Sequence, residues 1–324
     1  MTQIPLHTQI LSVPAARQDE SPLFGVLPAE IRSAIFSLAL TDYPDPTPDN
    51  QYAAETCYTR PHYFAPRKSD VALLQACRMA YAETWFLPFV LQEQTHWLTA
   101  QDRAPPEYKV HVSQRALQSR LQQIQEKRGG ETFDTEGLRV FAQMYVLEGG
   151  KLARLLLTPR LYPRRLTLTI RHADWWNWES DQPLRFEANW IKGVCDVLEG
   201  SVKEFCIELE SLERKKDQID LIAKQMREKW FFKRKDGAVL FPDVTGGNVE
   251  VSRWSGTSTW HGKTWTRDET EPGRIDYYVL TVPFLLQRTI ERKGGAVSEV
   301  AIQAANKNDF NPRKMKLFCP RPGR

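Results

Sequence analysis

The feature that most constrains the fold is a change of hydrophobic period near the middle of the chain. Before residue 163, apolar residues recur every three to four positions, which is typical of amphipathic helices. In RRLTLTIRH, residues 164–172, Leu166, Leu168 and Ile170 instead alternate with polar residues. The alternation predicts a half-buried strand, and it returns in VKEFCIEL at residues 202–209.

Helical patterns lie between and after these strands. They are expected at residues 185–199 and 213–230, followed by a short strand at 238–241. An alternation of strands and helices implies right-handed crossovers and some parallel pairing. We therefore expect an α/β (or α+β) fold, with N-terminal helices packed on a mixed sheet with crossover helices. Residues 246–272 are expected to form a long loop or hairpin, and residues 275–290 a last strand or helix.

The first half of the chain predicts helices separated by proline-rich loops. Pro28 suits the first turn of a helix whose apolar stripe is Ile31, Ile35 and Leu38. Pro44, which begins a proline-rich run, ends this helix. Further helices are expected from residue 69 or 70 to 88, at 113–128 and at 135–147, whereas 89–112 show no clear pattern.

These patterns divide the chain into five segments. We expect a flexible N-terminus, an interrupted helical segment, a helical connector, an α/β domain and a basic tail, at residues 1–22, 23–90, 91–160, 161–307 and 308–324. The chain has 324 residues, of which 41% are hydrophobic, so it can build one large core or two packed domains.

The charge distribution does not favour general nucleic-acid binding. The net charge is only +4, and Lys and Arg are interleaved with Asp and Glu along most of the chain. Short basic clusters keep a nucleic-acid-associated protein as an alternative function, beside a structural protein of unknown role. They lie at residues 160–165, 214–216, 233–235 and 313–316.

Cysteine usage and hydropathy predict a cytoplasmic or nuclear protein. The five cysteines are an odd number and widely spaced, which favours reduced thiols. The N-terminus lacks a basic region followed by an apolar run, and no stretch is apolar enough to span a bilayer. We therefore expect neither secretion nor a membrane partner.

No catalytic or metal-binding pattern stands out. The six histidines are scattered and form no H-x-x-x-H motif, and no C-x-x-C motif accompanies them. The glycine pairs lack both the Lys-Ser/Thr step of a P-loop and the G-x-G-x-x-G spacing. G-x-S-x-G is absent. We expect no enzyme activity, no catalytic residue, no metal and no cofactor. Asp174 and Glu179 could be interpreted as a glycosidase-type carboxylate pair, but no other motif supports that interpretation.

A tryptophan-rich segment, HADWWNWESDQP, directly follows the first predicted strand. Trp175, Trp176 and Trp178 beside carboxylates could bind a basic or apolar peptide, since tryptophan is common at binding hot spots. Ligands of α/β sheets also gather outside the carboxyl ends of strands. The alternative is that the three rings fill one end of the core.

Two separated segments resemble the halves of an F-box. LPAEIRSAIFSLAL matches its opening through Leu27, Pro28, Glu30, Ile31, Ile35 and Leu38. Some thirty residues later, DVALLQACRMAYAET resembles its second half through Leu73, Leu74, Cys77, Arg78 and Tyr81. With the TIRHADWWNWE block, residues 23–240 resemble a family of uncharacterised F-box-like proteins of filamentous fungi.

The resemblance implies a protein–protein interaction module, as in a substrate receptor of a cullin-RING ubiquitin ligase. Leu27, Pro28, Ile31, Ile35 and Leu38 would then face the ligase adaptor subunit. The three tryptophans or residues 246–272 would face the substrate. The insertion of some thirty residues departs from a compact F-box. Either this insertion is looped out, or the helices have become a structural cap on the larger domain. In the second case the apolar stripe would be part of the protein's own core.

Overall fold

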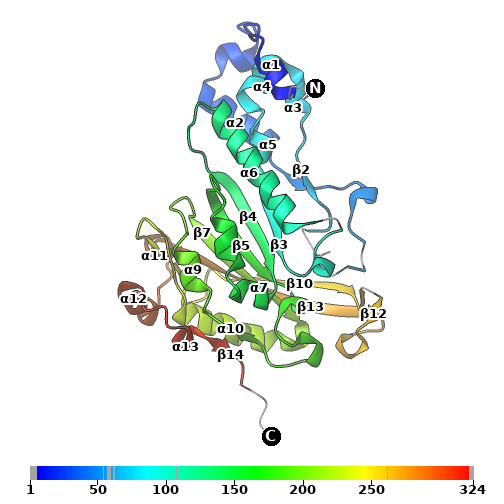
Figure 1. The fold of residues 1–324 in the computed structure, drawn as a ribbon, viewed down its shortest axis with the longest axis vertical. Helices are drawn as coiled ribbons and strands as arrows, with labels where there is room; N and C mark the ends of the chain where they lie inside the picture. The colour runs from blue at the N-terminus through cyan, green and yellow to red at the C-terminus, as the bar shows by residue number, and fades with distance from the viewer. Residues whose placement is uncertain are drawn as a thin grey trace. The chain divides into compact units, whose positions relative to one another are not determined.

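The computed structural model describes residues 6–53, 55–56, 60, 63–106, 108–260 and 262–320 (Figure 1). It contains helices and a curled mixed sheet, which confirms the α/β class. Among the residues described, none of the helices combines the length and the apolar character that crossing a bilayer requires.

The chain divides into two compact units. The first comprises residues 1–51 and 65–93, and the second comprises residues 52–64 and 94–324. The chain therefore leaves the first unit within the predicted insertion, contributes residues 52–64 to the second unit and returns. Part of the insertion is thus built into the second unit rather than looped out.

The first unit is made of short helices and one two-stranded sheet. Its elements are α1 (Leu6–Leu11), the π-helix η1 (Pro22–Val26), α2 (Ala29–Ala39), β1 (Tyr43–Pro44), η2 (Pro48–Asn50), β2 (Arg67–Lys68), α3 (Ala72–Ala76), α4 (Arg78–Thr84) and α5 (Leu87–Leu91). The helix predicted after Pro28 is confirmed as α2. The N-terminal segment expected to be flexible contains α1 and the start of η1.

The long helix predicted to end at residue 88 is broken into α3, α4 and α5. The break between α3 and α4 lies at Cys77, whose backbone is extended, with φ −160° and ψ 163°. Its Sγ accepts a hydrogen bond from the amide of Ala80 at 3.4 Å, so the side chain caps α4. A side chain that satisfies a free amide at this point favours a new helix start over a continuous helix.

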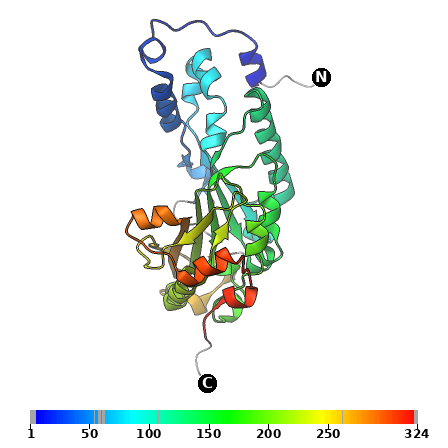
Figure 2. The same ribbon diagram turned by 90° about the vertical axis from the view of Figure 1, so that its left-hand side faces the viewer.

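The second unit is built on an eight-stranded sheet, seen in two views in Figure 1 and Figure 2. Its order is β3-β4-β5-β7-β13-β9-β8, and β10 also pairs with β13. The bounds are β3 (Glu93–Leu98), β4 (Thr135–Ala142), β5 (Pro163–Ile170), β7 (Glu204–Leu212), β8 (Phe232–Lys233), β9 (Val239–Pro242), β10 (Glu250–Thr257) and β13 (Arg274–Leu286). β4, β5 and β7 are parallel; the alternating pattern predicted parallel pairing for β5 and β7, whereas the residues of β4 were expected to be helical. β13 runs antiparallel to β7, β9 and β10.

Helices and two small sheets complete this unit. The helices are α6 (Val110–Lys127), α7 (Met144–Glu148), α8 (Lys151–Leu156), α9 (Ile191–Cys195), α10 (Lys216–Lys229), α11 (Gln287–Arg292), α12 (Glu299–Asn306) and α13 (Pro312–Met315). The 3-10 turns are η3 (Gln101–Arg103), η4 (His172–Asp174), η5 (Trp178–Ser180), η6 (Glu213–Lys215) and η7 (Thr266–Asp268). β6 (Arg185–Phe186) pairs with β14 (Leu317–Phe318), and β11 (Thr259–Trp260) with β12 (Lys263–Thr264).

The two faces of the parallel strands differ in chemistry. Leu168 of β5 lies in register with Ile207 of β7, and both are fully buried. α10 packs against β7 and β13 and buries Ile222. The opposite face carries Thr169 in register with Glu208. The period of two thus separates an apolar helix-covered face from a polar one.

The predictions of helices at residues 135–147 and 185–199 were partly wrong. Residues 135–147 form β4 followed by the short α7, because Leu138 and Val140 are buried in a strand paired with β5. Ladder hydrogen bonds to neighbouring strands outweigh local helix preference here. Residues 185–199 contain β6 and only a short α9. Residues 91–160, predicted as a helical connector, supply β3 and β4 to the sheet.

The described part of the basic tail, residues 308–320, is packed against the rest of the second unit. α13 and β14 lie within it, and Met315, Leu317 and Cys319 are buried. The Nε1–H group of fully buried Trp230 donates to the carbonyl of Met315 at 2.6 Å. This hydrogen bond anchors the tail to the end of α10.

Candidate functional sites

Helix α2 in the first unit has one buried and one exposed apolar side. Phe36 and Leu40 are buried, whereas Ile31, Ile35 and Leu38 are 49%, 42% and 80% exposed. At about 100° per residue, these three exposed side chains share one face of the helix. We call Ile31, Ile35 and Leu38 the α2 face.

The side of α2 away from this face is fixed to α4. The Arg32 guanidinium donates to both carboxylate oxygens of Glu83, at 3.0 and 3.3 Å, and to the carbonyl of Leu27 at 2.8 Å. It also lies 5.4 Å from the ring centre of Phe24. The two segments that flank the insertion therefore meet in space. A charged bidentate contact of this kind sets the rotation of α2 about its axis.

The other two predicted adaptor-facing residues precede the helix. Pro28 is exposed at the N-cap of α2, and its carbonyl accepts hydrogen bonds from the amides of Ile31 and Arg32. Leu27 is half-buried. The structure thus places four of the five predicted residues at exposed positions and Leu27 at a partly covered one.

The tryptophan-rich segment of the second unit is mostly interior. Trp175 and Trp178 are buried, and only Trp176 is half-buried. The indole of Trp175 donates to the carbonyl of Glu210 at 2.8 Å, and that of Trp176 to the Glu148 carboxylate at 2.7 Å. The prediction that these rings face a partner is therefore wrong for Trp175 and Trp178. Aromatic packing at the sheet end accounts for both.

Asp174 and Glu179 do not act as a pair. The Arg171 guanidinium donates to Asp174 at 2.6 Å, and both side chains are buried. Exposed Glu179 lies 3.5 Å from Arg103. Each carboxylate is engaged by a different arginine, so the glycosidase interpretation gains no geometric support.

A buried charge cluster lies on the polar face of β7. Arg60, from the insertion, is 3.0 Å from Glu208 and 3.3 Å from Glu210, and its side chain is only 9% exposed. Arg139 also reaches Glu208, at 3.4 Å. Burial alone would raise the pKa of Glu208, but Arg60 and Arg139 outweigh it and hold that pKa below its ordinary value.

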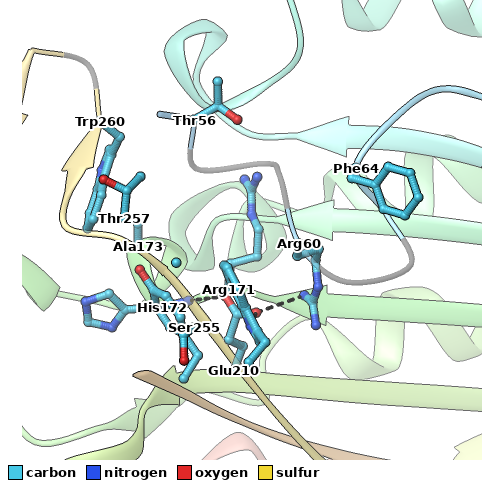
Figure 3. Close-up of a pocket in the computed structure, with 13 residues that line it drawn as sticks. Thr56, Arg60, Phe64, Arg171, His172, Ala173, Glu210, Ser255, Thr257 and Trp260 are labelled. Atoms are coloured by element: carbon cyan, nitrogen blue, oxygen red, sulfur yellow. Dashed lines mark hydrogen bonds and ion pairs between the residues drawn. The ribbon is translucent and has the colours of Figure 1, made fainter. Parts of the chain in front are cut away.

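A cavity of about 380 Å³ opens next to this cluster (Figure 3). It lies where β5, β7 and β10 end and β13 begins. Figure 3 shows Arg60 and His172 on either side of Glu210, each joined to it by a dashed line. The described residues that line the cavity come from five separate stretches: Thr56, Arg60 and Phe64; Arg171, His172 and Ala173; Glu210; Trp254 to Thr257 and Trp260; and Tyr277.

The aromatic wall of the cavity is held by stacking. The rings of Trp254 and Tyr277 are 4.3 Å apart and nearly parallel, at 16°. The Trp254 indole donates to Glu210 at 3.0 Å. Gly256 is required here, because a Cβ at that position would lie 2.7 Å from the Trp254 ring. The predicted substrate-facing stretch 246–272 therefore does line a cavity.

His172 lies between a serine and an aspartate without forming a catalytic triad. Its Nδ1 is 3.5 Å from Ser211 Oγ, and its Nε2 is 3.9 Å from Asp268. Ser211 is fully buried, and Asp268 is already held by Arg214 at 2.6 Å. Burial lowers the pKa of His172 to about 3, so the ring is neutral. These contacts describe packing rather than nucleophile activation.

Burial keeps two of the described cysteines, Cys195 and Cys319, protonated. Cys77, Cys195, Cys206 and Cys319 are free, as the spacing predicted, and Cys57 lies outside the described residues. Burial raises the pKa of Cys195 to about 12 and that of Cys319 to about 11, so neither is a thiolate at neutral pH. In the described part of the chain, no group of three His, Cys, Asp or Glu residues could hold a metal ion.

Most of the predicted basic clusters are engaged within the chain. Arg214 and Lys215 both pair with Asp181, and Lys216 pairs with Asp220. The other clusters form ion pairs as well: Arg164 with Asp134, Arg165 with Glu204, Arg234 with Asp236, Lys235 with Glu199, Lys314 with Asp309 and Lys316 with Glu187. Each of these cations therefore has a carboxylate partner within the same chain.

Comparison with protein-family models, with curated proteins and with solved structures found no match in any of the three searches.

Proposed function

We propose that this protein is a non-enzymatic interaction protein, an F-box-type substrate receptor that docks through the α2 face onto the adaptor subunit of a cullin-RING ubiquitin ligase. The observation that carries the proposal is the exposure of Ile31, Ile35 and Leu38 on a helix whose other side is buried and tied to α4. Single exposed apolar residues are ordinary, but three on one helical face are typical of a docking surface.

The chemistry of the α2 face favours an apolar helical partner. Its three side chains are aliphatic and recur at the spacing by which helices engage a hydrophobic groove. Arg32, the nearest cation, is already paired with Glu83 and faces α4. The binding free energy of a partner that covers this face would come mainly from the burial of apolar surface. The reduced cysteines fit a receptor that works in the cytoplasm or nucleus.

The test is binding of the purified full-length protein to the purified adaptor subunit, measured by calorimetry. We expect saturable binding that Leu38→Asp and Ile31→Asp each weaken by at least about tenfold, because a charge would be buried in an apolar contact. Leu38 is 80% exposed, so the substitution leaves the fold intact, which circular dichroism verifies.

The matched control is Ser33→Asp, which adds the same charge to an exposed position of α2 outside the α2 face. This variant should bind like the wild type. Equal affinity of all three variants, or no binding of the wild type at micromolar concentrations, would refute the proposal.

A further inference from the structure

The cavity in the second unit has preformed aromatic walls. Trp260 is buried and stacks on Trp265, with ring centres 5.7 Å apart. Trp254 stacks on Tyr277 and is fixed at its other end by Glu210. Because these rings are held by neighbours, a ligand would not have to order them on binding.

The charged groups of the cavity are already neutralised. Arg60 lies between Glu208 and Glu210, and Arg171 is paired with Asp174. His172 is buried and neutral. Among the described lining residues, an ionic ligand would therefore meet no unpaired countercharge in return for its lost hydration, whereas a neutral ligand avoids that cost.

We propose that this cavity binds a neutral, planar aromatic small molecule by stacking against Trp254 and Trp260. Its volume of about 380 Å³ falls in the range of small-ligand pockets. Its place at the carboxyl ends of β5 and β7 is where sheets of this class bind ligands. Flat aromatic walls favour a flat aromatic partner through offset stacking.

The proposal goes beyond the adaptor-docking function and does not depend on it. Every lining residue that the structure describes belongs to the second unit, whereas the α2 face belongs to the first. Loss of adaptor binding with retained ligand binding, or the reverse, would therefore separate the two proposals.

The test uses three probes with the same ring and different charge: naphthalenemethanol, naphthoate and naphthylmethylammonium. Binding to the full-length protein is measured by saturation-transfer NMR titration at neutral pH. We expect saturable binding of the alcohol with a sub-millimolar Kd, and binding at least about tenfold weaker for both ions. A charged probe that binds as tightly as the alcohol, or an alcohol that does not saturate, overturns the proposal.

A matched pair of variants locates the site. Thr257→Phe places a ring in the cavity and should abolish binding of naphthalenemethanol, since Thr257 lines the cavity (Figure 3). Val251→Phe adds a comparable bulk at an exposed position of the same strand, β10, and should leave the Kd unchanged. Equal binding by the Thr257→Phe variant overturns the assignment, and thermal unfolding confirms that both variants are folded.

Discussion

Arg60 lies between two carboxylates of β7, and its side chain is nine-tenths buried. Glu208 and Glu210 lie on the polar face of the sheet. Without Arg60, the negative charge of Glu210 would have no cation beside it, and that of Glu208 would have only the more distant Arg139. A buried charge pair adds little net stability compared with an apolar pair, but loss of one partner leaves a desolvated charge. The contribution of Arg60 to stability is therefore seen as the loss of stability when Arg60 is replaced.

We predict that Arg60→Met lowers the free energy of unfolding by about 3 kcal/mol, because two buried carboxylates lose their shared cation. The measurement is a urea unfolding midpoint followed by tryptophan fluorescence. Arg164→Met is the matched control, because Arg164 is 59% exposed in its pair with Asp134 and should cost less than about 1 kcal/mol. Similar costs for the two variants would contradict the role given to Arg60.

In the C-terminal tail, the short strand β14 is held in place because one of its two side chains is buried and the other is exposed. β14 has only two residues, yet Leu317 is fully buried while its neighbour Phe318 is 52% exposed. Pairing with β6 and the hydrogen bond from Trp230 to Met315 hold the strand in this register. The composition of the tail indicated only a basic segment. Its packing depends on a few buried apolar side chains.

We predict that Leu317→Ala lowers the free energy of unfolding by about 2–4 kcal/mol, since a buried leucine side chain is removed and a cavity remains. Phe318→Ala removes a larger side chain from the same strand but should cost less than about 1 kcal/mol, because that ring is half in solvent. Chemical denaturation of both variants compares them directly. A larger cost for Phe318→Ala would show that the tail packs differently.

In the described part of the second unit, folding keeps two buried histidines neutral. Burial lowers the pKa of His96 to about 4 and that of His172 to about 3, from an ordinary value of 6.5. The unfolded chain therefore takes up protons below about pH 6.5 that the folded chain does not. Stability is retained above that pH and is lost as the pH falls toward these lowered values.

We predict that each of these histidines removes up to about 1.4 kcal/mol of stability per pH unit between about pH 6.5 and pH 5. His96→Asn should make this loss shallower even if the variant is less stable at neutral pH. Urea unfolding at several pH values measures the slope, with exposed His111→Asn as the control. An unchanged slope in the His96→Asn variant would contradict the assignment.

The sequence by itself determined the elements whose apolar period is strong and local. β5, β7, α6 and α10 match their predicted ranges closely, because each has a regular apolar period; α6 and α10 expose the side opposite the core, whereas both faces of β5 and β7 are largely buried. The stripe of Ile31, Ile35 and Leu38 was likewise readable from its spacing. Periodicity reports which residues share a face, since that depends only on backbone geometry.

Only the tertiary structure decided what covers each face. It placed β4 in the sheet, left Ile31, Ile35 and Leu38 exposed, and enclosed Trp175. It also brought Arg60 from the insertion against Glu210, far apart in sequence. These outcomes rest on long-range packing and charge pairing, whose energies depend on neighbours that no local pattern specifies.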